Sequence, residues 1–118
     1  MSSFVSIVEL IKKGESQTIE FKTSFQKEVI ISVVSFANAK GGQIFIGVHD
    51  SGKILGIEIK QESLQDWINQ IKLNTQPSIL VDIEEYTTDN KTIAIIEVKE
   101  YPLKPIAYKN RYYKRIKN

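Results

Sequence analysis

Hydrophobic and polar positions follow two different periods along the first part of the chain. Near the N-terminus, apolar residues recur at the spacing of an amphipathic helix, which Gly14 would end. Residues 18–22 instead alternate with a period of two, which predicts a strand with Ile19 and Phe21 on its buried face. A second helical pattern follows, and Ser24 is a candidate for its N-cap. The apolar positions of the two helices are Phe4, Ile7, Val8 and Ile11, then Val29, Ile30, Val33, Val34 and Ala37.

The middle of the chain predicts a buried strand and a hairpin. Residues 43–48 are nearly all apolar and bounded by glycines, as in a central strand covered on both faces. Turn-forming residues at 49–52 predict that residues 53–57 return as a hairpin partner. A third helix is predicted around Leu64, Trp67, Ile68 and Ile71. Further strands are predicted at 79–86 and 91–98, with a last short hairpin within 106–116 turning near 109–110. Together these elements predict an α+β fold with a mixed β-sheet and about three helices.

Length and composition narrow the class of protein. A chain of 118 residues predicts one domain, residues 1–118, and 42% hydrophobic with 25% charged residues excludes a disordered or collagen-like chain. The absence of cysteine excludes disulfides and thiolate zinc sites, and agrees with a reducing compartment. The longest apolar stretch, residues 29–39, is too short to cross a bilayer, and the N-terminus lacks the pattern of a signal peptide. We therefore expect a cytoplasmic protein that does not associate with membranes.

Positive charge is concentrated at the C-terminus. Sixteen Lys and Arg against fourteen Asp and Glu give a net charge of +2, but residues 99–118, the C-terminal basic segment, carry seven basic residues and one acid. Cations bind phosphates by releasing counterions, and tyrosine rings stack on bases, so this segment predicts nucleic-acid binding. A solvated basic edge strand is the alternative interpretation. Tyr108 is interleaved with these cations, and the candidate binding residues are Lys109, Arg111, Tyr112, Tyr113, Lys114, Arg115 and Lys117.

Three carboxylates are the candidates for chemistry, because His49 is the only histidine and no nucleophilic triad can be assembled. Glu15 precedes the first predicted strand, Glu20 lies within it, and Asp50 follows the buried strand. If the two strands are neighbours, the three acids would converge at one edge of the sheet. Such oxygen ligands suit Mg²⁺ or Mn²⁺ at a phosphodiester, with Lys22 neutralising phosphate charge. Alternatively, the acids are a turn former, a loop residue and a strand surface charge.

The chain also resembles a known family. The segments ESQTIEFK (15–22), SFANAKGGQIFIGVHDSGKILGI (35–57) and P-x-x-Y…RYYKR (105–115) are similar to the Schlafen AlbA_2 domain, in the same order and over essentially the whole chain. The resemblance implies nucleic-acid binding. It also implies a further activity, because the family includes endoribonucleases that cut tRNA-like structured RNA with a metal-supported trio of acids. The matching positions here are Glu15, Glu20 and Asp50.

Some features depart from those nucleases. They contain two related lobes, whereas this chain has one, so homodimerisation would have to replace the second lobe. His49 stands where an acid is common in the family. Two functions therefore stay open. One is a Mg²⁺- or Mn²⁺-dependent endoribonuclease with Glu15, Glu20, Asp50 and Lys22 as catalytic residues. The other is a non-catalytic DNA- or RNA-binding module, such as a transcriptional regulator or chromatin-like protein, whose acids are structural.

Overall fold

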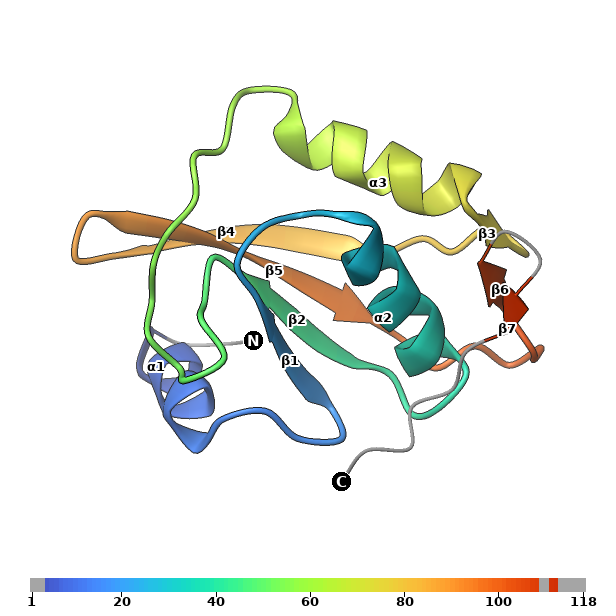
Figure 1. Cartoon of the computed structure of the whole chain (residues 1–118), viewed down its shortest axis with the longest axis horizontal. Coiled ribbons are helices and arrows are strands. Elements are labelled where there is room, and N and C mark those ends of the chain that lie inside the picture. The colour runs from blue at the N-terminus through green and yellow to red at the C-terminus, as the bar shows by residue number, and fades with distance from the viewer. Residues whose placement is uncertain (1–3, 109–110, 113–118) are drawn as a thin grey trace.

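The computed structural model describes residues 4–108 and 111–112, and its centre is a four-stranded sheet flanked by helices (Figure 1). The helices are α1 (Phe4–Lys13), α2 (Lys27–Ala37) and α3 (Ser63–Leu73). The main sheet contains β1 (Ile19–Lys22), β2 (Gly42–Ile46), β5 (Lys91–Val98) and β4 (Asp82–Thr88), in that order. A second, small sheet contains β3 (Thr75–Gln76), β6 (Ala107–Tyr108) and β7 (Arg111–Tyr112). β1 and β2 are parallel and the other pairs antiparallel, which confirms the predicted α+β fold with a mixed sheet.

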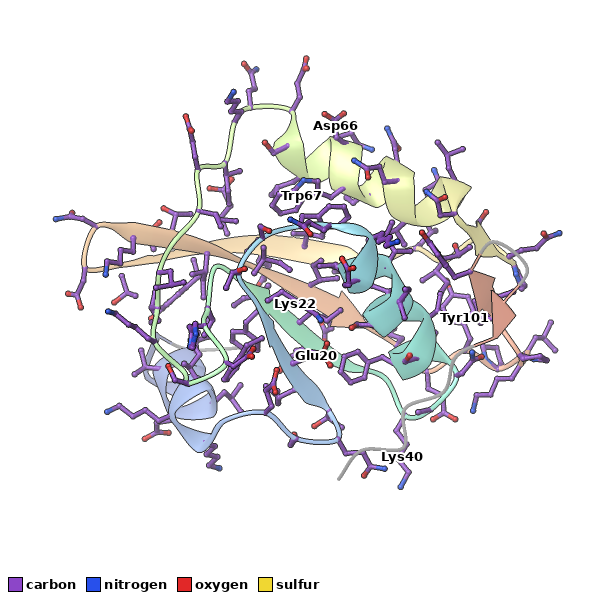
Figure 2. All side chains as sticks on the ribbon, in the orientation of Figure 1. Glu20, Lys22, Lys40, Asp66, Trp67 and Tyr101 are labelled. Carbon is purple, nitrogen blue, oxygen red and sulfur yellow. The ribbon has the colours of Figure 1, made fainter. Side chains whose placement is uncertain are left out.

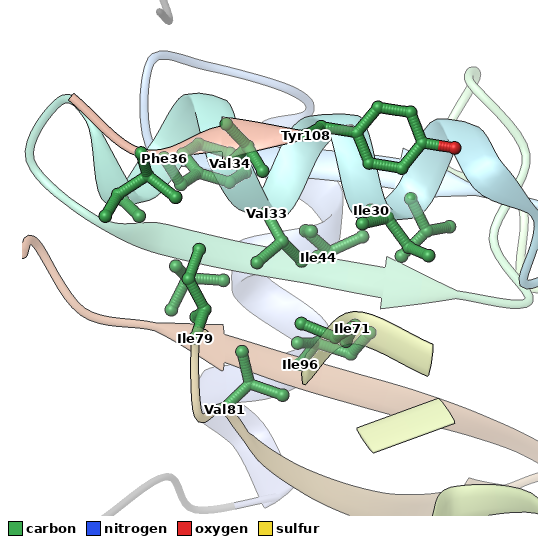
Figure 3. Packing of buried hydrophobic residues seen from close by; sticks show 14 of the residues in the cluster. Ile30, Val33, Val34, Phe36, Ile44, Ile71, Ile79, Val81, Ile96 and Tyr108 are labelled. Carbon is green, nitrogen blue, oxygen red and sulfur yellow. The ribbon is translucent and has the colours of Figure 1, made fainter. Parts of the chain in front are cut away.

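The central strand β2 is buried on both faces, as its apolar sequence predicts. On one face, Ile44 and Ile46 pack with α2 and with Ile71 of α3 (Figure 3). On the other face, Phe45 packs with Ile7 and Ile11 of α1. We call these the α2 face and the α1 face of the sheet. Side chains alternate between the two faces along a strand, so β2 and β5 contribute to both hydrophobic clusters, whereas β1 contributes Ile19 and Phe21 to the cluster on the α1 face only.

The helix α2 begins later than the sequence predicts, because Ser24 does not cap it. Gln26 is the N-cap, and its side chain makes no capping hydrogen bond. Phe25 stacks on Trp67 of α3, with ring centroids 4.9 Å apart and an interplanar angle of 2°. This contact keeps Phe25 in the loop before the helix. The prediction of a Ser24 cap was therefore wrong because it ignored a tertiary contact.

The predicted hairpin after β2 is reduced to one bridge, between Val48 and Ile54. The carbonyl of Gly47 accepts hydrogen bonds from the backbone N–H groups of both Leu55 and Gly56, at 2.8 and 2.9 Å. Gly56 has a φ of +83°, a conformation that glycine adopts without a steric penalty, and it turns the chain away from β2. Residues 53–57 therefore form an irregular crossing, not a strand.

The last predicted hairpin is present in its central part. β6 pairs antiparallel with β7 on one side and with β3 on the other. Tyr108 is only 8% exposed and packs beside α2 in the core (Figure 3). The turn at 109–110 and the predicted strand end beyond 112 lie outside the described residues. No helix within residues 4–108 is long and apolar enough to cross a membrane.

Candidate functional site

The two strands that carry the candidate acids are neighbours, as the hypothesis of a shared site requires. β1 and β2 are parallel, with Glu20 opposite Ile44 and Lys22 opposite Ile46. The carboxyl ends of the two strands therefore lie together, and Asp50 follows four residues after β2 ends. The register brings the strands together but does not by itself decide where each side chain points.

Glu20 lies on the α2 face and is held there by two groups. Its Oε2 accepts a hydrogen bond of 2.7 Å from the Oγ of Ser32 in α2. The Nζ of Lys22 lies 3.0 Å from the same oxygen, and the side chains of Lys22 and Glu20 are 27% and 13% exposed (Figure 2). A carboxylate with so little exposure needs such partners, because removing an unpaired charge from water is costly. Glu20 is thus a fixed, mostly buried anion beside a cation.

Ser32 is a site residue that the sequence reasoning missed. It is 7% exposed and stands among the buried apolar residues of α2. A polar residue within an apolar helical stripe is a signal, because buried hydroxyls almost always have a hydrogen-bond partner. The identity of that partner depended on the packing of α2 against β1, which the pattern of α2 alone does not contain.

Glu15 points to the outer edge of the sheet. Its Oε2 accepts a hydrogen bond of 3.0 Å from the backbone N–H of Phe21. The carbonyls of Thr18 and Lys22 accept hydrogen bonds from β2. The backbone groups of successive residues in a strand point alternately to its two sides, so the backbone N–H of Phe21 is directed away from β2. The Glu15 carboxylate therefore covers a free donor of an edge strand, which blunts that edge against pairing with other chains.

Asp50 lies in an exposed turn beyond β2. Its neighbours hold the turn together, since the Nδ1 of His49 accepts the backbone N–H of Ser51 at 3.0 Å and also lies 3.0 Å from the Ser51 hydroxyl. Across residues 4–108, no three His, Asp or Glu side chains are grouped so as to hold a metal ion. Glu15 faces the sheet edge, Glu20 faces α2, and Asp50 lies past the strand end, so this arrangement is not a preformed metal site.

The C-terminal basic segment is described only in part. Lys99 is exposed, whereas the ammonium of Lys104 is paired with the carboxylate of Glu100. Tyr108 is buried in the core, so it is not a ring on which a base can stack. Arg111 and Tyr112 form β7, and the remaining candidates lie outside the described residues: Lys109, Tyr113, Lys114, Arg115 and Lys117.

A comparison with protein families identifies the chain. The model of the family described as Schlafen, AlbA_2 matches residues 15–118, which include Glu15, Glu20 of β1 and the whole main sheet. The chain belongs to the Schlafen AlbA_2 family. This confirms the resemblance that the sequence motifs indicate. No curated protein is significantly similar to this Schlafen AlbA_2 domain.

Two solved structures share the fold of this Schlafen AlbA_2 domain. One is the N-terminal domain of an ATP-dependent DNA helicase RecG-related protein from Nitrosomonas europaea, with a TM-score of 0.72 and 21% identity, covering 100% of this chain and 91% of that one. The other is the DIP2311 protein from Corynebacterium diphtheriae, with a TM-score of 0.68 and 17% identity. The similarity to DIP2311 covers 89% of this chain but only 23% of that protein.

Proposed function

We propose that this Schlafen AlbA_2 domain binds nucleic acid through its C-terminal basic segment, residues 99–118. The observation that carries the proposal is the charge distribution: seven of the sixteen Lys and Arg residues lie in these twenty positions, and the rest of the chain is acidic. Such a segment attracts the phosphate backbone and releases counterions when it binds. The fold shared with the N-terminal domain of a protein described as ATP-dependent DNA helicase RecG-related agrees with this function.

The structure narrows which groups of the segment would bind the nucleic acid. Tyr108 packs into the core and Lys104 is paired with Glu100, so both serve the fold. Binding is then left to the exposed Lys99, to the cations from Lys109 onward and to Tyr112 or Tyr113. These two tyrosines are adjacent, so in an extended strand they point to opposite sides and one of them would stack on a base.

The experiment is fluorescence anisotropy with a labelled hairpin RNA and a duplex DNA of the same length, over a series of salt concentrations. The variant Lys114→Ala/Arg115→Ala should weaken binding to all sequences alike. It should also reduce the slope of log K against log salt by about 0.9 for each phosphate that the variant no longer neutralises. The control is Lys53→Ala/Lys60→Ala, which removes the same charge from exposed positions outside the segment. Equal affinity and slope in both variants would contradict the proposal.

A second, finer proposal is that the domain is a metal-dependent endoribonuclease acting on structured, tRNA-like RNA. The observation that favours it is Glu20, a carboxylate fixed by Ser32 and Lys22 on a strand adjacent to the one that leads to Asp50. A mostly buried acid beside a lysine is more typical of a site than of an ordinary strand surface. Because Glu15, Glu20 and Asp50 form no metal group in this arrangement, we assign no step to a metal.

An assay of RNA cleavage distinguishes the nucleic-acid-binding domain from the endoribonuclease. The protein would be incubated with tRNA and with duplex DNA in the presence of Mg²⁺, Mn²⁺ or EDTA, beside the variant Glu20→Gln. RNA fragments that require metal and disappear in Glu20→Gln would support the endoribonuclease. The exposed Glu58→Gln is the matched control and should cleave like the original chain. Intact RNA that still shifts the anisotropy would leave a non-catalytic binding domain.

A further inference from the structure

The carboxylate of Glu20 already has a cation beside it, and that cation belongs to the same chain. The Nζ of Lys22 lies 3.0 Å from the Oε2 of Glu20, and the two residues are two positions apart on β1, so their side chains share the α2 face (Figure 2). At this distance an ammonium and a carboxylate form a charge-assisted hydrogen bond as well as an ion pair. The ion pair between Lys104 and Glu100 is more exposed on both sides.

The partial burial of this ion pair makes Lys22 hard to replace. Both side chains are partly buried, and that of Glu20 is the more buried of the two. Opposite charges attract each other more strongly where water is partly excluded, and a mostly buried carboxylate without a partner is costly. The negative charge of Glu20 is therefore compensated within the domain itself. A cation from solution has to compete with the ammonium of Lys22 for this carboxylate.

Ser32 occupies the buried side of the same carboxylate oxygen. Its hydroxyl donates a hydrogen bond of 2.7 Å from α2 to the Oε2 of Glu20, and the residue is buried. Lys22 is more exposed than Ser32, so its ammonium covers the side of the oxygen that is nearer to solvent. A divalent cation such as Mg²⁺ keeps several water molecules when it binds to protein, so it would approach from the solvent side. Lys22 stands on that approach.

The other two candidate acids do not join Glu20 in attracting a cation. The Oε2 of Glu15 accepts the backbone N–H of Phe21 at the sheet edge, and Asp50 lies in an exposed turn. Within residues 4–108 the three acids do not form a group that could hold a metal ion. These residues therefore do not fit a metal centre in this arrangement, and the position of Lys22 at Glu20 supplies a physical reason.

We propose that Lys22 is a built-in competitor of divalent cations at Glu20, so that such a cation binds this carboxylate only when Lys22 has left it. A lysine suits this use, because its flexible four-carbon stem lets the ammonium move into water while the strand stays in place. The inference concerns the site of the endoribonuclease proposal and rests on that proposal for its functional meaning. Metal binding tests it directly, so an absence of RNA cleavage would contradict the endoribonuclease without deciding this competition.

The test is a titration of nucleic-acid-free protein with Mn²⁺, followed by NMR. A paramagnetic ion at the carboxylate broadens the backbone amide signals of Glu20 and Ser32. Lys22→Met keeps most of the side-chain length and removes the ammonium. In this variant, half-maximal broadening should require roughly tenfold less Mn²⁺ than in the original chain, because a positive charge next to the binding oxygen is gone. The double variant Lys22→Met/Glu20→Gln should lose this gain.

Lys53→Met is the matched control, because Lys53 is exposed after β2 and makes no ion pair among the described residues. It removes the same charge from the chain and should leave the broadening at Glu20 and Ser32 unchanged. The dispersion of the amide signals shows whether each variant is folded, and Lys22→Ala replaces Lys22→Met if the methionine disturbs the packing. Equal Mn²⁺ requirements in the original chain and the Lys22 variant overturn the proposal. So does a gain that persists in the double variant.

Discussion

Asn38 and Ile106, 68 residues apart in the chain, are joined by two hydrogen bonds. The Nδ2 of Asn38 donates to the carbonyl of Ile106 at 2.9 Å, and the backbone N–H of Ile106 donates to the Oδ1 of Asn38 at 2.6 Å. Both residues are buried. The C-cap residue of α2 thus fixes the chain just before β6, within the C-terminal basic segment.

Asn38→Ala should lower the free energy of unfolding by about 2–4 kcal/mol, because it leaves a buried donor and a buried acceptor of Ile106 without partners. Urea unfolding measures this change. Asn69→Ala, on the exposed side of α3, is the control and should change stability by less than about 0.5 kcal/mol. Equal stability of the two variants would show that the Asn38 side chain does not hold the C-terminal segment.

Glycine is required at position 42 because a side chain would not fit there, and not because the backbone adopts an unusual conformation. A Cβ at this position would lie 2.6 Å from ring atoms of Phe36 and 2.8 Å from the carbonyl oxygen of Thr18. Gly42→Ala should therefore destabilise the fold by about 1–3 kcal/mol through overpacking. In Gly42→Ala/Phe36→Leu, the destabilisation should be smaller than the sum of the two single effects, because the smaller side chain relieves the clash with the ring, although not the one with the Thr18 carbonyl. Additive effects in urea unfolding would contradict this explanation.

Ser32→Ala removes the hydroxyl that donates to Glu20 and should cost about 1–2 kcal/mol, since hydrogen bonds to charged groups are stronger than neutral ones. Ser35 is the matched control in the same helix, because its hydroxyl bonds only to the carbonyl of Ile31 one turn earlier. Ser35→Ala should be nearly neutral in thermal unfolding. If both variants are destabilised equally, the hydrogen bond between Ser32 and Glu20 contributes nothing.

Trp67 is the only tryptophan, so its fluorescence reports the stack with Phe25. Phe25→Ala should shift the emission to longer wavelength, because water reaches the uncovered indole face. It should also lower stability by about 1–2 kcal/mol. Phe25→Tyr keeps a ring in place and should retain the original emission. An unchanged spectrum in Phe25→Ala would mean that the stack does not form in solution.

Much of the fold could be predicted because it depends on local periodicity. Alternation at Ile19 and Phe21 identified β1, and the apolar run 43–48 identified the central strand, because burial selects residues at the repeat of each element. The start of α2 and the crossing at 53–57 were not predictable in this way. They depend on Phe25 meeting Trp67 and on the Gly47 carbonyl accepting two bonds, which are interactions between segments that are apart in sequence.

The sequence by itself determined the family, the mixed α+β architecture and the concentration of cations in residues 99–118, because motifs, periodicity and charge are properties of the chain order. Only the tertiary structure decided how each acid is used. Glu15 faces the sheet edge and Glu20 faces Ser32, although both belong to one short motif. The same structure placed Asp82 opposite Glu97, since strand register depends on how the two faces of the sheet are buried together.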